Sequence, residues 1–323
     1  MKNKFHGGHP SMFGVNERQQ LLVDIARMYY FENLSQQQIA DTLHMSRSNV
    51  SLLLKECLEK KIIEIQINDV VSRAHELAAK IKQRYGLQTV LIARSCHNPE
   101  QTVASVARLA AHYLRGIVGN NMLIGYTNDT MMRILSDVLY FPEYIKINSI
   151  QMLGGTFSTY HDEDGQFLAR EFQKKCNGTA YVLQAPQMVK STMLKQALLE
   201  EPVIKDIFYR FGDIDIALTT IEKRVPLYGL PSDDFLSSTD SMQLSELGAI
   251  CHFCGHYLDR DGKPCSASIN DRVIAISLQQ FRKIPIRVGL AANANNAPAV
   301  LSCMQGRYIN VLIVDEALAK NLI

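Results

Sequence analysis

The sequence has little net charge of either sign and no long apolar run. Its 323 residues include 34 Lys and Arg against 32 Asp and Glu, a formal net charge of +2, so composition does not mark a general polyanion binder. The most apolar stretches, such as Ile286–Ala292 and Val311–Val314, are far shorter than the roughly 20 residues that a membrane-spanning helix needs. We therefore do not expect a membrane protein.

A secretory signal is also missing. Residues Met1 to Gly14 carry Lys2 and Lys4 but no apolar segment after them, unlike a signal peptide, and their Gly, His, Pro and Ser content is typical of a flexible arm. The 7 cysteines, an odd number in a chain without such a signal, favour reduced thiols in the cytoplasm. We see no internal repeat and no low-complexity segment.

Catalytic and metal-binding motifs are absent as well. Cys251 and Cys254 are close enough in the chain to share a metal, but a structural zinc site needs a second well-spaced pair, so we predict buried thiols in a strand. Carboxylates and histidines show no spacing of a nucleophile and its base. They include Asp129, His161, Asp162, His252 and Asp271. We predict no catalytic residue, no metal and no cofactor.

The length and the 47% hydrophobic content fit two packed domains. We predict a flexible arm over residues 1–16, a helix-turn-helix DNA-binding domain over 17–68, a linker over 69–76, and an effector-binding and oligomerisation domain over 77–323. Apolar spacing in the small domain predicts three helices and a closing strand. They are Glu17–Asn33, Gln36–Leu43, Arg47–Lys61 and the strand Ile62–Ile67.

The segment from Gln36 to Lys55 has the pattern of a helix-turn-helix. Small Ala40 allows two helices to cross closely, and Ser35 and Ser46 are suitable N-caps for them. The turn position often held by glycine is His44, which must then adopt a left-handed conformation. The alternative is an ordinary helical hairpin whose polar residues merely face water.

The first turn of the second helix presents side chains suited to DNA. Arg47 can make two hydrogen bonds to guanine, Asn49 can make two to adenine, and the hydroxyl of Ser48 can bond to any base. Ser51 and Lys55 are suited to contacts with phosphates. The predicted DNA-binding residues are Ser35, Gln36, Ser46, Arg47, Ser48, Asn49, Ser51 and Lys55. Residues 1–68 carry a net charge of only +1, so one such domain should bind weakly. We therefore expect at least a dimer on paired half-sites.

Beyond residue 74, strand-like and helical patterns alternate, which predicts a parallel sheet covered by helices on both faces. The predicted strands are Thr89–Ala93, Met122–Tyr126, Ile147–Leu153, Ala180–Leu183, Ile214–Leu218, Ile286–Ala291 and Val311–Val314. The predicted helices include Glu100–Arg115, Thr130–Leu139, Gln166–Cys176 and Asn296–Met304.

Several ordered motifs accompany the head, which runs from Leu21 to Ile67. They are QMLGG at Gln151–Gly155, QAP at Gln184–Pro186, INDRVIAIS at Ile269–Ser277 and GRYINVLIVDEALA at Gly306–Ala319. By this head and these motifs the chain resembles the SorC family of sugar-responsive bacterial regulators, whose sensor is DeoR-like. The resemblance implies an α/β protein: a winged helix-turn-helix joined to a Rossmann-like effector domain of the sugar-phosphate isomerase-like type. It also implies operator DNA as a partner, phosphorylated sugars as effectors, and a homo-oligomer, either a dimer or a tetramer.

A strand-to-helix junction is the best candidate for the effector pocket. Backbone N–H groups at the start of a helix suit a phosphate, and a second glycine pair follows a neighbouring strand. The predicted effector-binding residues are Gly125, Thr127, Asn128, Asp129, Thr130, Gly154, Gly155, Thr156, Gln184, His252, Asn293 and Asn296. Asp129 has two interpretations of equal weight, a ligand for sugar hydroxyls or an acid that stabilises its own helix.

Three positions depart from the family pattern. Asp129 stands beside the hydroxyl residue where the family has no acid, His252 replaces an acid, and Asn296 replaces the lysine of a Gly-Gly-x-x-Lys segment that reads Ala292–Asn296 here. The loss of a cation and the gain of an acid disfavour phosphate. They indicate either a divergent effector, such as one without a phosphate, or a weakened response to the effector.

Two other classes of function are weighed against the regulator. The isomerase-like domain raises the alternative of an enzyme, but a fold alone does not establish catalysis. A purely structural DNA-binding protein would respond to no effector. We predict a sequence-specific, DNA-binding transcriptional regulator of a carbohydrate-utilisation operon. It is controlled by a sugar or sugar-phosphate effector and is not an enzyme.

Overall fold

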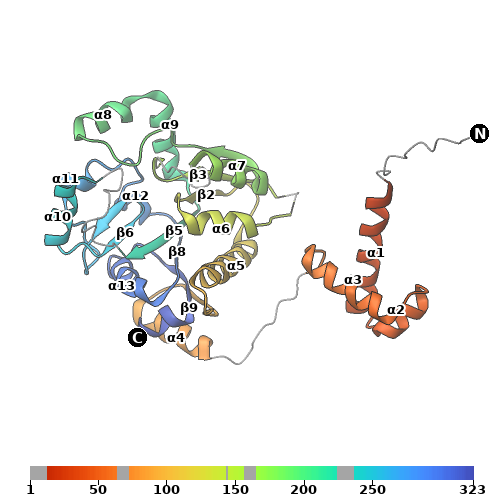
Figure 1. Ribbon diagram of the computed structural model, residues 1–323. Coiled ribbons are helices and arrows are strands. Elements are labelled where there is room, and N and C mark those ends of the chain that lie inside the picture. The colour runs from red at the N-terminus through yellow and green to blue at the C-terminus, as the bar shows by residue number, and fades with distance from the viewer. Residues whose placement is uncertain (1–12, 64–72, 143–144, 156–164, 224–235) are drawn as a thin grey trace, which may run out of the picture. The chain divides into compact units, whose positions relative to one another are not determined.

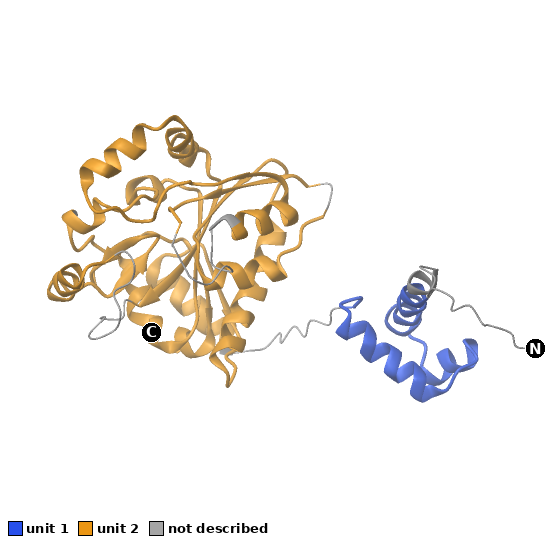
Figure 2. Ribbon diagram, turned by 45° about the horizontal axis from the view of Figure 1, so that its top comes forward, with its two compact units in different colours: residues 1–70 blue, residues 71–323 orange. Residues whose placement is uncertain are grey.

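The computed structural model describes residues 13–63, 73–142, 145–155, 165–223 and 236–323. The chain divides into two compact units, residues 1–70 and 71–323, which are coloured separately in Figure 2. We call them the small unit and the large unit and describe each by itself. None of the helices in the described part of the chain is long and apolar enough to span a membrane.

The small unit contains helices α1 (Phe13–Tyr30), α2 (Gln36–Thr42) and α3 (Arg47–Glu59). They bury one apolar cluster to which all three contribute. It consists of Leu22, Ile25, Ala26, Ile39, Ala40, Val50, Leu53, Leu54 and Cys57. Ser35 accepts a hydrogen bond from the Gln38 backbone N–H at 3.3 Å, and Ser46 accepts one from that of Asn49 at 3.2 Å, so both predicted N-caps are confirmed. The predicted left-handed turn residue His44 is confirmed too, at φ 51°.

Two predicted boundaries around the small unit are wrong. The arm was expected to reach residue 16, but α1 already begins at Phe13, since adding a residue to a formed helix costs little compared with nucleating it. The linker was expected over 69–76, but α4 (Arg73–Tyr85) begins inside it. Glu76 in its first turn and buried Ile81 stabilise that helix. Residues 64–67 of the predicted closing strand, and hence the wing, lie outside the described residues.

The large unit is built on a mainly parallel sheet with strand order β1-β9-β8-β5-β2-β3-β4. Its strands are β1 (Thr89–Ala93), β2 (Leu123–Tyr126), β3 (Ile147–Gln151), β4 (Asn177–Tyr181), β5 (Ile216–Lys223), β8 (Ile286–Ala291) and β9 (Val311–Asp315). A short hairpin, β6 (Cys251–Phe253) and β7 (His256–Leu258), joins antiparallel to the end of β5. Its tight turn is made by Cys254 and Gly255, at φ 47° and 80°, the left-handed conformations that two-residue hairpins favour.

Helices cover both faces of this sheet (Figure 1). The large unit contains helices α4, α5 (Pro99–Ile117), α6 (Thr130–Val138), α7 (Gly165–Cys176), α8 (Thr192–Glu200), α9 (Pro202–Arg210), α10 (Ser238–Glu246), α11 (Ala267–Asn270), α12 (Leu278–Phe281), α13 (Ala297–Gln305) and α14 (Glu316–Lys320). Alternate residues of β9 explain the arrangement: Val311 and Ile313 join the core under α5, α6 and α7, whereas Leu312 and Val314 join the core on the other face. The predicted fold class is confirmed.

The order of the strands also creates one special position at the centre of the sheet. From β2 the chain proceeds to β3 and β4 on one side, whereas β5 leads to β8 and β9 on the other. The direction therefore reverses between β2 and β5, which pair in parallel. Such a switch point opens a crevice at the carboxyl ends of the two strands, where α/β proteins commonly bind ligands.

Candidate functional site

The first candidate site is the exposed face of α3 in the small unit. Ser46, Arg47, Ser48, Asn49, Ser51 and Lys55 are all exposed there, Ser35 is exposed before α2, and Gln36 is half-buried. Ser35 and Ser46 also cap the helices, so their side chains have a structural task in the free protein. The described geometry therefore leaves the first turn of α3 open to a partner.

The sequence analysis missed one residue on this face. Leu52 is 65% exposed, although leucine is usually buried, and it lies one turn after Ser48 and one turn before Lys55 along the same stripe of the helix. The spacing of positions 48, 52 and 55 was the available signal. An apolar side chain at this place can contact the methyl group of thymine in a major groove.

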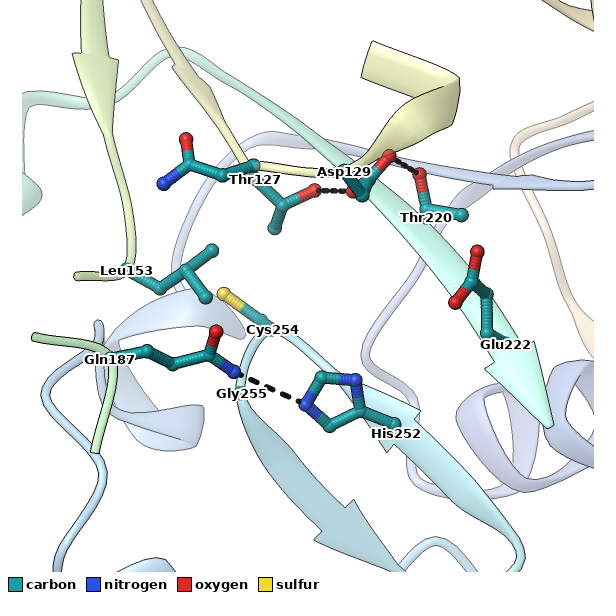
Figure 3. A pocket seen from close by; sticks show the side chains of 10 residues that line it. Thr127, Asp129, Leu153, Gln187, Thr220, Glu222, His252, Cys254 and Gly255 are labelled. Atoms are coloured by element: carbon teal, nitrogen blue, oxygen red, sulfur yellow. Dashed lines mark hydrogen bonds between the residues drawn. The ribbon is translucent and has the colours of Figure 1, made fainter. Parts of the chain in front are cut away.

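The second candidate site is a pocket at the switch point of the large unit. Its lining comes from the ends of β2, β3 and β5, from the β6–β7 hairpin, and from a loop before α8. The lining residues are Thr127, Asn128, Asp129, Leu153, Gln187, Thr220, Glu222, His252, Cys254 and Gly255. Figure 3 shows Asp129 between Thr127 and Thr220, with Cys254, Gln187 and His252 on the opposite wall.

Asp129 is held by several hydrogen bonds within the protein. Its Oδ1 accepts from the backbone N–H of Met132 at 3.0 Å and from the Thr220 hydroxyl at 2.7 Å, and its Oδ2 accepts from the Thr127 hydroxyl at 2.7 Å. It is thereby the N-cap of α6. Burial raises the pKa of this carboxyl group, and the donated hydrogen bonds oppose the shift. This geometry agrees with the interpretation of Asp129 as an acid that stabilises its own helix.

Asn128 differs from its neighbour because its side chain has no partner. Both polar atoms of its amide, Oδ1 and Nδ2, are buried without a hydrogen bond, although Asn128 lines the pocket. Buried polar groups are normally satisfied, since an unmade hydrogen bond costs about 1–3 kcal/mol. An unpaired donor and an unpaired acceptor on one side chain therefore indicate a ligand that can both donate and accept.

The opposite wall carries uncharged groups. Burial lowers the pKa of His252 to about 4, so this imidazole is neutral near pH 7, and its Nε2 lies 3.5 Å from the amide nitrogen of buried Gln187. Burial also raises the pKa of the Cys254 thiol far above its ordinary range, with the nearby Asp129 charge adding to the effect. The wall therefore offers hydrogen bonds and a thiol, not a cation. Cys251 and Cys254 are both buried, as predicted, but only Cys251 lies in a strand, because Cys254 belongs to the tight turn after β6.

Four of the predicted effector residues line the pocket, namely Thr127, Asn128, Asp129 and His252. Thr130 is the exposed first residue of α6, and Thr156 lies outside the described residues. Gln184 is exposed and away from the lining, whereas Gln187, three residues later, lies in it. Sequence reasoning missed Gln187 because the loop between β4 and α8 has no periodicity that fixes which side chain faces inward.

The predicted glycines serve the packing of the sheet. Gly125 lies within β2 between β3 and β5, and a Cβ there would come within 2.7 Å of Met152 Sδ. A Cβ on Gly154 would meet the backbone of Pro186 at 2.5 Å, while the Gly155 N–H donates to the Ala185 carbonyl at 2.8 Å. None of the three lines the pocket. The small size of Gly125 and Gly154 lets neighbouring segments approach closely, whereas a Cβ on Gly155 would have room.

Asn293 and Asn296 lie beside the pocket and not in its lining. The Asn293 backbone N–H donates to Asp315 Oδ1 at 2.7 Å. Asn296 donates from Nδ2 to the Ala292 carbonyl at 2.8 Å and accepts at Oδ1 from the Lys223 backbone N–H, also at 2.8 Å. The amide of Asn296 thus holds the end of β5 in place by hydrogen bonds, and β5 is the strand that contains Thr220 and Glu222.

The comparisons with known proteins bear on both units. Residues 69–323 match the family described as "Putative sugar-binding domain", and residues 14–60 match Sigma-70, region 4, on the three helices of the small unit. The deoxyribonucleoside regulator of Bacillus subtilis is 28% identical over 95% of this chain and 98% of its own, and the sorbitol operon regulator of Klebsiella pneumoniae is 22% identical over 94% and 97%.

Solved structures share the fold. Full-length SorC from Klebsiella pneumoniae superposes with a TM-score of 0.79 at 20% identity, covering 94% of this chain and 98% of that chain. A transcriptional regulator from Streptococcus pneumoniae covers 77% of this chain and 96% of its own with a TM-score of 0.71 at 21% identity. Since the sugar-binding-domain model spans most of the sequence, the chain belongs to the SorC family of transcriptional regulators with a sugar-binding domain.

Proposed function

We propose that this protein binds operator DNA through α3, controls a carbohydrate-utilisation operon, and responds to a small polyhydroxylated effector in the switch-point pocket. One observation carries the proposal: a single chain joins an exposed, polar α3 to a pocket with an unpartnered buried amide. The relatives named as regulators of a sorbitol operon and of deoxyribonucleosides support it. A cytoplasmic location follows from such a function.

In this proposal, the residues of α3 divide into two roles. Arg47, Ser48 and Asn49 read base edges, and Leu52 contacts a thymine methyl group. Ser51 and Lys55 contact phosphates, as do Ser35, Gln36 and Ser46 at the starts of the two helices, where backbone N–H groups favour anions.

We further propose that the protein acts as a homo-oligomer, a dimer or a tetramer. Residues 1–68 carry a net charge of only +1, so a single small unit gains little from the release of counterions. Two linked units bind paired half-sites with a higher effective concentration. An effector that changes the packing of large units would then change the spacing of the two α3 helices.

The chemistry of the pocket supports binding and not catalysis. The Cys254 thiol is not activated, because burial and Asp129 raise its pKa. Both carboxylate oxygens of Asp129 accept hydrogen bonds from within the protein. A nucleophile needs the opposite, a lowered pKa or an adjacent base. Turnover of sugars or sugar phosphates at enzymatic rates would refute this interpretation.

Binding of DNA is tested by fluorescence anisotropy with a duplex from upstream of the protein's own gene. Arg47→Ala should weaken specific binding by about 1–3 kcal/mol without altering binding of the effector. Arg27→Ala is a matched control, since Arg27 is an exposed cation on α1; it should weaken all sequences equally and only slightly. Unchanged affinity of Arg47→Ala for the duplex would refute the assigned role of α3.

A further inference from the structure

We propose that the effector of this protein carries no phosphate at the α6 end of the pocket and is an uncharged polyhydroxylated molecule, because Asp129 already takes the place of an anion there. The inference rests on the proposed function, since it concerns the ligand of the same pocket. It reverses the expectation that the family resemblance gives, in which the effector is a phosphorylated sugar.

The start of α6 is a place where an anion would ordinarily bind. Backbone N–H groups and hydroxyl groups converge there at the carboxyl end of β2, next to the switch point. In this protein the Met132 N–H and the hydroxyls of Thr127 and Thr220 all donate to the Asp129 carboxylate, at 2.7–3.0 Å. A phosphate would find these donors taken and would face a like charge.

The rest of the lining offers no compensation for a second anion. No Lys or Arg is among the residues that line the described pocket. His252 is neutral near pH 7 because burial lowers its pKa to about 4, and Glu222 adds another carboxylate. Phosphate sites are normally built with Arg, Lys or several free N–H groups, and this pocket has the opposite charge.

The groups that remain open match hydroxyls. The Asn128 amide presents one donor and one acceptor, both buried and unpartnered, and a hydroxyl group can satisfy both at once because it donates and accepts. The Gln187 amide lines the same pocket as Asn128. A ligand with several hydroxyls can therefore satisfy both walls without bringing any charge.

Inorganic phosphate tests the exclusion without knowledge of the effector. We expect the full chain to show no binding of phosphate by calorimetry at millimolar concentration. Asp129→Ser keeps a capping hydroxyl while freeing the anion position. It should bind phosphate measurably, at least tenfold more tightly than the detection limit that bounds the wild type. Asp129→Asn, which keeps the size of the side chain and still caps α6, serves if the serine variant does not fold and should give a smaller gain. Asp137→Asn removes an exposed acid from the same helix and should change nothing.

Matched pairs of sugars test the preference itself. The probes are D-ribose, D-fructose and D-glucitol, each beside its terminal phosphate ester, in a thermal-shift titration of the wild type. An uncharged member should bind at least tenfold more tightly than its phosphate. The inference is overturned if a phosphate ester binds more tightly than its parent, or if wild type binds inorganic phosphate as tightly as Asp129→Ser. A different result would refute the proposed function: a ligand that binds in the pocket but leaves the affinity for operator DNA unchanged.

Discussion

The hydroxyl of Thr220 is the most informative group to remove from the pocket. Thr220 is 8% exposed, and its hydroxyl donates to Asp129 Oδ1 at 2.7 Å. Thr220→Val keeps the shape of the side chain but removes one of the donors that offset the burial of the carboxylate. A hydrogen bond to a charged group contributes about 1.5–3 kcal/mol, so we expect a loss of about 2 kcal/mol in the free energy of unfolding near neutral pH.

The pH dependence identifies the cause. Burial already raises the pKa of Asp129 in the folded protein, and the loss of a donor raises it further. A carboxyl group with a raised folded pKa contributes stability that is present in acid and is lost as the pH rises through that pKa. The difference between wild type and Thr220→Val should therefore grow with rising pH and shrink in acid, where Asp129 is protonated in both proteins.

The measurement is urea unfolding between pH 4 and 8, followed by far-UV circular dichroism. Thr219→Val is the matched control: Thr219 is fully buried, but its hydroxyl donates to a neutral acceptor, the carbonyl of Thr220, at 3.3 Å. It should cost about 1 kcal/mol or less at every pH. A loss for Thr220→Val that equals that of the control, or that is largest in acid, would refute the account of Asp129.

Three further predictions concern other parts of the molecule. Leu52→Ala should reduce operator affinity by about 0.8 kcal/mol or more, and replacing the contacted thymine by uracil should then cost the variant nothing in anisotropy titrations. Ser46→Ala removes the cap of α3 and should lower the stability of the small unit by about 1 kcal/mol, whereas Ser51→Ala should be neutral in thermal melts. His252 has a folded pKa of about 4, so its neutral form stabilises the fold at pH 7; wild type should lose about 2 kcal/mol more than His252→Gln between pH 7 and 5 in urea titrations.

Much of the sheet could be predicted because strands such as β1 and β8, TVLIA and IRVGLA, are rich in apolar residues. The bounds predicted for β1 and β8 agree with the structure. The start of strand β4 was placed three residues too late, because its sequence NGTAY contains no buried residue and gives little hydrophobic signal. The helix α8 contains no buried residue, and only its Leu198 and Leu199 pack, half-buried, against the core.

The candidate site was predicted only where it depends on local sequence. The local sequence predicts both the position of Asp129 ahead of a helix and its role as an N-cap. Its partner Thr220 is 91 residues away, and only the pairing of β2 with β5 brings the two together. Gln187 and Cys254 enter the pocket through a loop and a tight turn. Sequence patterns do not encode such long-range neighbours.

The central claim is that an uncharged ligand in the switch-point pocket controls the affinity of α3 for operator DNA. It is tested most directly by titrating the full chain into labelled operator duplex, with and without the sugar that binds most tightly in the thermal-shift series. We predict that this sugar changes the operator affinity at least tenfold, that its phosphate ester does not, and that Asn128→Ala abolishes the change while still binding the duplex. An operator affinity that is the same with saturating sugar, or one that responds only to the phosphate ester, would contradict the account.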